Sequence, residues 1–109
     1  MNLDSFFLSS YCLRTYNCAH FTADVWYALT GQKILSLLLQ PFENRRNFKL
    51  VKQHKQPCIA LLTQVDGKHH VGVKLGRRIL HITHNGVQYL NVSAVTPGYS
   101  KIRFYLPCL

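Results

Sequence analysis

The second half of the chain is a succession of short apolar runs separated by tight-turn sequences. Asp66-Gly67 and Asn85-Gly86 are typical of two-residue hairpin turns, and Gly76 begins a third short connection. The runs that the turns separate have the length of strands, and they cover residues 58–64, 69–75, 79–84, 87–92 and 101–106. Because turns this short join neighbouring antiparallel strands, this half predicts an antiparallel meander of about five strands.

The first half of the chain has helical periodicity instead. The clearest helix covers residues 17–31, where Asn17 is a good N-cap and Gly31 is placed to end the helix. Apolar residues recur between them at the spacing of one helix face, namely Phe21, Val25, Trp26 and Leu29. This segment predicts an amphipathic helix that packs on the sheet.

Three other segments of the first half are less regular. Residues 4–13 predict a short first helix, and residues 34–40 another turn or two. The polar segment 43–54 holds several basic residues and predicts a solvated helix or loop. Without repeats or linkers, residues 1–109 are expected to form a single α+β domain with N-terminal helices packed on a C-terminal antiparallel sheet.

The balance of charges constrains the partners of the chain. Its 13 Lys and Arg residues stand against 4 Asp and Glu residues, for a formal net charge of +9. Such an excess favours a polyanionic partner such as nucleic acid, an anionic membrane or an anionic cell-wall polymer. No basic-aromatic motif of a nucleic-acid-binding domain is present, so we do not expect a nucleic-acid partner. No apolar run approaches the roughly 20 residues that cross a bilayer, so we expect no membrane span.

The N-terminus and the cysteines bear on the cellular compartment. The first residues lack the features of a secretory signal, so we expect synthesis in the cytoplasm without a signal peptide. The four cysteines (Cys12, Cys18, Cys58 and Cys108) are scattered and include no C-x-x-C pair. In a cytoplasmic product we expect free thiols, most of them buried. A Cys12–Cys18 disulfide stays open as an alternative that the compartment disfavours.

Cys18 is the first candidate for chemistry. It follows the expected cap Asn17 and so occupies the first turn of a helix, where free backbone N–H groups and the helix dipole stabilise a thiolate. The thiolate is the nucleophilic form of cysteine. Position alone favours the plainer interpretation of Cys18 as a small buried hydrophobe.

Two histidines on neighbouring strands are the second candidate. Strand alternation separates them from an apolar set on the other face, which consists of Val71, Val73, Leu80 and Ile82. A turn that pairs Leu75 with Arg78 would place His70 diagonally from His81, with Gly72 leaving room beside them. We expect His70 to take the thiol proton and His81 to hold its other ring nitrogen. The alternative is a solvated sheet face that carries two surface histidines.

These residues resemble a known family, the NlpC-type papain-like cysteine peptidases that cut peptidoglycan stem peptides. Residues 16–21 (Tyr-Asn-Cys-Ala-His-Phe) are similar to the family's nucleophile segment. Residues 70–76 (His-Val-Gly-Val-Lys-Leu-Gly) and 79–81 (Ile-Leu-His) resemble its base strand and the strand of its third polar residue. The match extends over residues 15–106.

The resemblance implies a papain-like core and a cysteine peptidase or amidase without metal or cofactor. Its catalytic residues would be Cys18, His70 and His81, and Tyr16 and Asn17 would contact the substrate or the oxyanion together with the Cys18 backbone amide. Small relatives of this kind resemble tail-associated phage proteins that open the cell wall. The implied partners are therefore peptidoglycan and phage tail proteins, and the implied location is a virion or the bacterial cell wall.

Two alternatives stay open beside this hydrolase hypothesis. Asn17, Ala19 and His20 replace the Asp, Ser and Gly that are usual in the family, which favours a weak or inactive assembly component of a phage tail that keeps the fold. In the other alternative, Cys18, His70 and His81 are zinc ligands, although none of them has the close spacing of common structural sites. Four other histidines are interpreted as structural or incidental: His20, His54, His69 and His84.

Overall fold

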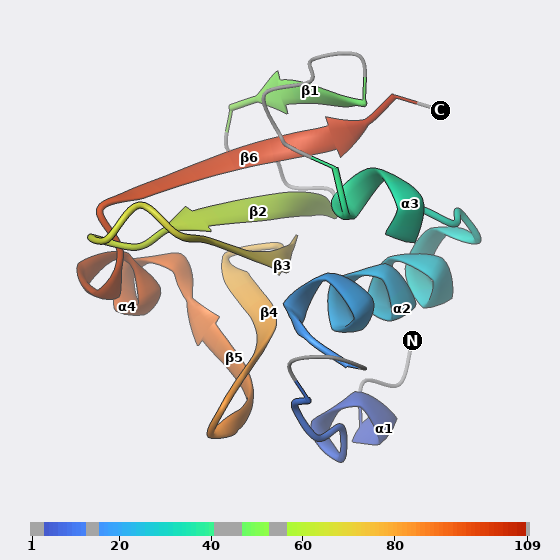
Figure 1. Ribbon diagram of the computed structural model, residues 1–109, viewed down its shortest axis with the longest axis horizontal. Helices are drawn as coiled ribbons and strands as arrows, with labels where there is room; N and C mark the ends of the chain where they lie inside the picture. The colour runs from blue at the N-terminus through green and yellow to red at the C-terminus, as the bar shows by residue number, and fades with distance from the viewer. Residues whose placement is uncertain (1–3, 13–15, 41–46, 53–56, 109) are drawn as a thin grey trace.

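The fold of the chain combines a few helices with one six-stranded antiparallel sheet. The computed structural model describes residues 4–12, 16–40, 47–52 and 57–108. In chain order the described elements are α1 (Asp4–Phe7), α2 (Cys18–Thr30), α3 (Leu35–Leu38), β1 (Phe48–Val51), β2 (Cys58–Thr63), β3 (His69–Leu75), β4 (Arg78–Thr83), β5 (Gly86–Asn91), α4 (Val92–Val95), a 3-10 turn (Thr96–Gly98) and β6 (Lys101–Pro107). The expected α+β class, with helices first and most of the sheet after them, is confirmed (Figure 1).

The long helix α2 begins and ends where its capping residues predict. The side chain of Asn17 accepts hydrogen bonds from the first-turn backbone, and Gly31 ends the helix in the left-handed conformation at φ 75°. The buried face includes Phe21, Val25 and Trp26, as the periodicity predicts. α2 has 13 residues, and within the described part of the chain no helix is long and apolar enough to cross a membrane.

The sheet has the strand order β1-β6-β2-β3-β4-β5 (Figure 1). The three hairpins from β2 to β5 confirm the expected short antiparallel connections, including the pairing of Leu75 with Arg78. The last strand does not extend this meander. β6 crosses back and pairs with β2, so that β2, whose first five residues are all buried, has a partner on each side.

Three expectations about the first half and the connections were wrong. Segment 43–54 contains the strand β1 rather than only a solvated helix or loop, because Phe48 turns inward, with 3% exposure, and β1 pairs with β6. This strand is the reason that the sheet has six strands rather than about five. The first helix ends at Phe7, and soon after it Cys12 pairs with Tyr16 in an isolated β-bridge. Helix α4 was not expected.

Parts of these predictions fall outside the described residues. The end of segment 4–13 and the two ends of segment 43–54 are among them, together with the basic residues Arg45, Arg46 and Lys55. No comparison is made for these positions.

The two faces of the sheet carry separate hydrophobic clusters. Helix α2 packs on β3 and β4, and its cluster contains the apolar set that strand alternation predicts: Val71, Val73, Leu80 and Ile82. The opposite face is covered by α4 and contains Cys58, Ala60, Leu62, Ile79, Val95 and Phe104. The sheet is therefore the middle layer, with α2 and α4 on opposite sides of it (Figure 1).

Gly72 lies where β3 and β4 approach each other most closely. A Cβ atom at Gly72 would lie 2.9 Å from the Cβ of His81 and 2.9 Å from the backbone oxygen of Leu80. The backbone oxygen cannot move aside without disturbing the strand, so Gly72→Ala is expected to lower the free energy of unfolding by about 1–3 kcal/mol. Urea unfolding followed by circular dichroism measures this change.

Gly98→Ala is the matched control, because nothing lies within 4 Å of the corresponding position and its backbone is not left-handed. The free energy of unfolding of this variant should lie within about 0.5 kcal/mol of the native value. Equal destabilisation by the two substitutions would contradict the steric explanation.

Candidate active site

Cys18 begins helix α2 at the position that its cap defines. Oδ1 of Asn17 accepts hydrogen bonds from the backbone N–H of Ala19 at 3.0 Å and of His20 at 3.4 Å. The ring of His20 completes a capping box, in which its Nδ1 lies 3.3 Å from the backbone nitrogen of Asn17. The Cys18 amide is not among the groups that the Asn17 side chain binds, and the Cys18 side chain is half-buried.

His20 therefore has a local structural reason to stand where the resembled family has glycine. A capping box usually has a Glu or Gln side chain at this position. Here the ring of His20 takes that place and stabilises the start of the helix. The interpretation of His20 as structural agrees with this contact.

His70 and His81 form a direct pair on the face of the sheet opposite to α2. Nε2 of His70 lies 2.8 Å from Nδ1 of His81, and the two rings meet edge to face with their centroids 5.0 Å apart. His81 is 1% exposed, and His70 is partly buried. The predicted side-by-side arrangement of the two rings, with Gly72 against His81, is confirmed.

Tyr99 joins this pair, and the sequence did not indicate it. Its ring is parallel to that of His70, with 3° between the planes and 6.3 Å between the centroids. Burial raises the pKa of Tyr99, and the negative charge of a Cys18 thiolate raises that pKa further. Tyr99 is thus stacked on His70, which binds His81, and its pKa also responds to the charge of Cys18.

The paired β3–β4 register ends just before the two histidines. The two strands are paired from Leu75 and Arg78 only as far as Val73 and Leu80, and the ladder ends there. The unpaired continuations carry His70 and His81, and α2 packs against both strands.

Both histidines are held neutral near pH 7. Burial, followed by the positive charges of His81 and His84, lowers the pKa of His70 to about 4. Burial also lowers the pKa of His81 to about 4, against a smaller opposite effect of the neighbouring Gln88 side chain. When Nε2 of His70 carries the ring proton, it donates a hydrogen bond to Nδ1 of His81. Nδ1 of His70 then keeps its lone pair and is able to accept a proton.

His81 has one ring nitrogen for which the described residues offer no partner in hydrogen-bond geometry. Nε2 of His81 is fully buried and unsatisfied, even though Gln88 lies directly across from His81 on β5. A buried unpaired polar atom costs about 1–3 kcal/mol, so it is uncommon away from functional sites. We therefore attribute the atom to the site, where Gln88 or a water molecule can reach it.

Tyr16 and Asn17 are occupied by contacts of their own. The hydroxyl of Tyr16 donates a hydrogen bond of 2.7 Å to Oδ2 of Asp24. Burial, followed by the bond to Asp24, raises the pKa of Tyr16 to about 12. Oδ1 of Asn17 caps α2. Both residues adjoin Cys18 in the chain, and a role for them in substrate binding stays a prediction.

The other cysteines differ from Cys18 in their surroundings. All four thiols are free, and only Cys58 is buried, so the expectation that most of them are buried was wrong. Burial raises the pKa of Cys58, while the charge of Lys74 opposes this increase. Cys12 and Cys108 are exposed. Within residues 4–12, 16–40, 47–52 and 57–108, no group of three or more His, Cys, Asp or Glu side chains is arranged to hold a metal ion.

Comparison with known proteins adds no relative: no family model matches the chain, and no curated protein matches it significantly.

The buried histidines predict a loss of stability in mild acid. The pKa of each ring falls from 6.5 to about 4 on folding, so below about pH 6.5 the unfolded chain binds protons that the folded chain excludes. The stability contributed by the neutral rings is complete above pH 6.5 and declines as the pH falls toward 4. At about pH 5 the free energy of unfolding should be lower by on the order of 2 kcal/mol for each ring.

Urea unfolding at about pH 7.5 and about pH 5 measures this loss in the native protein and in His81→Gln. The variant should show a shallower pH dependence, whereas His69→Gln, a change at an exposed neighbouring histidine, should keep the native dependence. Identical pH dependence in the native protein and His81→Gln would contradict the assigned burial of neutral rings.

Proposed function

We propose that the chain is a cysteine-nucleophile hydrolase of the NlpC-type papain-like group, cleaving amide bonds of peptidoglycan stem peptides. The observation that carries the proposal is the 2.8 Å bond between Nε2 of His70 and Nδ1 of His81, in a chain that also has a cysteine at the start of α2. A base whose far nitrogen is held by a third residue is the arrangement that cysteine and serine hydrolases share. Supporting features are the order of Cys18 before His70 and the packing of α2 on a mostly antiparallel sheet.

The proposed reaction proceeds through a thioester. Nδ1 of His70 takes the proton of the Cys18 thiol, and the sulfur attacks the carbonyl carbon of the amide. The backbone N–H of Cys18 at the start of α2 stabilises the oxyanion that forms on the carbonyl oxygen. His70 then gives its proton to the leaving amine, which departs and leaves the acyl group on the sulfur.

Water completes the cycle. His70 takes a proton from a water molecule, the resulting hydroxide attacks the thioester, and the carboxylic acid leaves while Cys18 regains its proton. Nδ1 of His81 accepts the hydrogen bond from Nε2–H of His70 throughout the cycle. It thereby stabilises the His70 imidazolium, which forms twice in each turnover. The sum is one amide and one water converted into one acid and one amine.

Tyr99 contributes to this proposal by restricting His70. A ring stacked on one side of His70 and a hydrogen bond on its Nε2 leave the imidazole few orientations, and Nδ1 is the nitrogen that stays available. Such preorganisation reduces the cost of reaching a reactive geometry. Of the four thiols, Cys18 is the one whose charge affects the pKa of Tyr99, the ring stacked on His70.

The proposed setting is a phage tail or another vehicle that brings the domain to the bacterial wall. Peptidoglycan peptides would be the substrate, and tail proteins would be partners. The support for this setting is the resemblance of residues 16–21 and 70–81 to small tail-associated peptidases.

A structural tail component with the same fold is the second candidate. It is favoured by the Tyr16 hydroxyl, which is bound to Asp24 and therefore not free to contact a substrate. It is also favoured by the replacement of the family's usual residues at Asn17, Ala19 and His20. The two candidates differ in whether the Cys18 thiol is needed for an activity.

Cys18→Ala tests the catalytic proposal. The substitution removes the nucleophile but keeps a small side chain, so the variant should fold like the native protein and lose wall-degrading activity by a factor of at least about 1,000. Release of amino groups from purified peptidoglycan, with a zymogram beside it, measures the activity. Circular dichroism and urea unfolding check the fold.

Cys108→Ala is the control, because it removes another free thiol that is exposed and lies at the far end of β6. This variant should keep full activity. Equal clearing by the native protein and Cys18→Ala, or no activity in a correctly folded native protein on walls of several chemotypes, would favour the structural candidate.

A further inference from the structure

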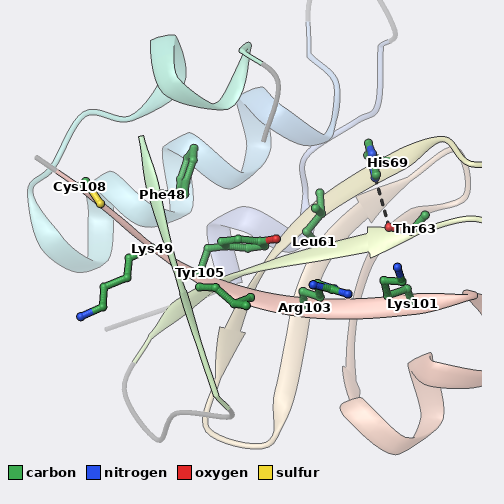
Figure 2. A pocket seen from close by; sticks show the side chains of 10 residues that line it. Phe48, Lys49, Leu61, Thr63, His69, Lys101, Arg103, Tyr105 and Cys108 are labelled. Atoms are coloured by element: carbon green, nitrogen blue, oxygen red, sulfur yellow. Dashed lines mark hydrogen bonds between the residues drawn. The ribbon is translucent and has the colours of Figure 1, made fainter. Parts of the chain in front are cut away.

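A second concave surface lies on the same face of the sheet as α2, beyond the strands that α2 covers. It is a groove of about 730 Å³ over β1, β6 and β2, and it also includes the start of β3 (Figure 2). None of its lining residues belongs to the candidate active site. His69 lines the groove, and because neighbouring residues of a strand point to opposite faces, His70 turns the other way.

The polar side chains of the groove are basic. Lys49, Lys101 and Arg103 carry permanent positive charges, and all three are exposed. No Asp or Glu lines the groove among the described residues. The groove therefore concentrates part of the net charge of +9 in a surface depression, where it attracts anions more strongly than on a convex surface.

The cations are arranged in rows by the strand register. Lys101 lies opposite Thr63, which in turn lies opposite His69, and the Thr63 hydroxyl is 3.2 Å from Nδ1 of His69. Arg103 lies two residues along β6, opposite Leu61, so its charge is repeated roughly 6.7 Å further on the same face. Figure 2 shows Lys101 and Arg103 next to each other on β6, whereas His69 lies on β3 beyond Thr63, to which a dashed line joins it. A linear array of this kind fits a chain of repeated negative charges better than a single anion.

The aromatic residues of the groove decide between two kinds of polyanion. Single-stranded nucleic acids bind basic grooves through exposed aromatic rings on which bases stack. Here Phe48 is 3% exposed, and Tyr105 is partly buried, with the two rings in edge-to-face contact at 6.4 Å. No lining aromatic ring within the described residues is fully exposed for stacking. The groove thus has cations for a phosphate backbone and lacks a platform for bases.

We infer that this groove binds an anionic phosphodiester polymer without bases, of the poly(polyol phosphate) type found in bacterial cell walls. Lys101 and Arg103 contact successive phosphates, with His69 and Thr63 beside them and Lys49 on the far rim. The inference rests on the proposed function for its biological meaning, since such a polymer would hold the domain at the wall while the separate Cys18 site acts on peptides.

The experiment measures binding of purified poly(glycerol phosphate) to the native protein, by fluorescence anisotropy of the labelled polymer over a range of salt concentrations. The double variant Lys101→Gln/Arg103→Gln should bind about tenfold more weakly at low salt. The slope of log affinity against log salt should fall by about 2, that is by about 1 for each phosphate-contacting cation removed.

A matched double variant, Lys33→Gln/Arg77→Gln, removes one Lys and one Arg from exposed positions outside the groove. Its affinity for the polymer should lie within about twofold of the native affinity. This result would distinguish a specific site in the groove from a general effect of net charge. Equal losses in the two double variants, or no measurable binding by the native protein, would overturn the inference.

A poly(dT) oligonucleotide of matched charge is the second ligand. Weaker binding than poly(glycerol phosphate) supports the assigned occupant, whereas equal or tighter binding that depends on Lys101 and Arg103 would assign the groove to nucleic acid and overturn the inference. The binding assay requires no catalysis. No polymer binding by a native protein that shows Cys18-dependent hydrolysis would reject this inference alone. Polymer binding that depends on Lys101 and Arg103, without any Cys18-dependent hydrolysis, would reject the proposed function alone.

Discussion

The hydrogen bond between Nε2 of His70 and Nδ1 of His81 is the interaction on which the candidate site depends. It forms because the β3–β4 hairpin has the register Leu75 opposite Arg78, which brings the two rings to one face at the point where the strands separate. The close approach of Gly72 to His81 is a condition of the same geometry, since a side chain at Gly72 would displace the second ring. A turn of different length would separate the two imidazoles.

Burial of the two histidine rings is energetically costly, and it also creates the environment that the proposed chemistry uses. Two imidazoles removed from water are neutral in the resting protein at about pH 7, as their pKa values of about 4 indicate. The same environment keeps a lone pair on the base in its resting state and strengthens each electrostatic contact with a developing charge. Tyr99 contributes to this environment, because its ring stacks on one side of His70 and its pKa responds to the charge of Cys18.

Much of this arrangement could be predicted from local sequence signals. The cap at Asn17, the stop at Gly31 and the hairpin turns are each determined by a few neighbouring residues, and they agree with the structure. Strand alternation was enough to place His70 and His81 on one face, opposite the apolar set that packs in the cluster of α2. The helix, the hairpins and the histidine pair therefore followed from short-range patterns.

Long-range contacts account for what the sequence did not reveal. The return of β6 to β2 depends on how the whole sheet is covered, and a turn motif carries no such information. The strand β1 was hidden in a basic segment because only Phe48 is strongly buried there. Tyr99 follows an irregular turn, so no period relates it to His70. The groove arises from β1, β6 and β2 together, and its basic residues are separated by half of the chain.

The most direct test of the central claim is the alkylation rate of individual thiols by iodoacetamide in mildly acidic buffer, resolved by peptide mass mapping. If His70 activates Cys18, Cys18 should react at least about tenfold faster than the exposed Cys108, and His70→Gln should reduce it to the rate of Cys108. The rate of Cys108 itself should not change. Equal rates for Cys18 and Cys108 in the native protein, or a Cys18 rate that is unaffected by His70→Gln, would contradict the account.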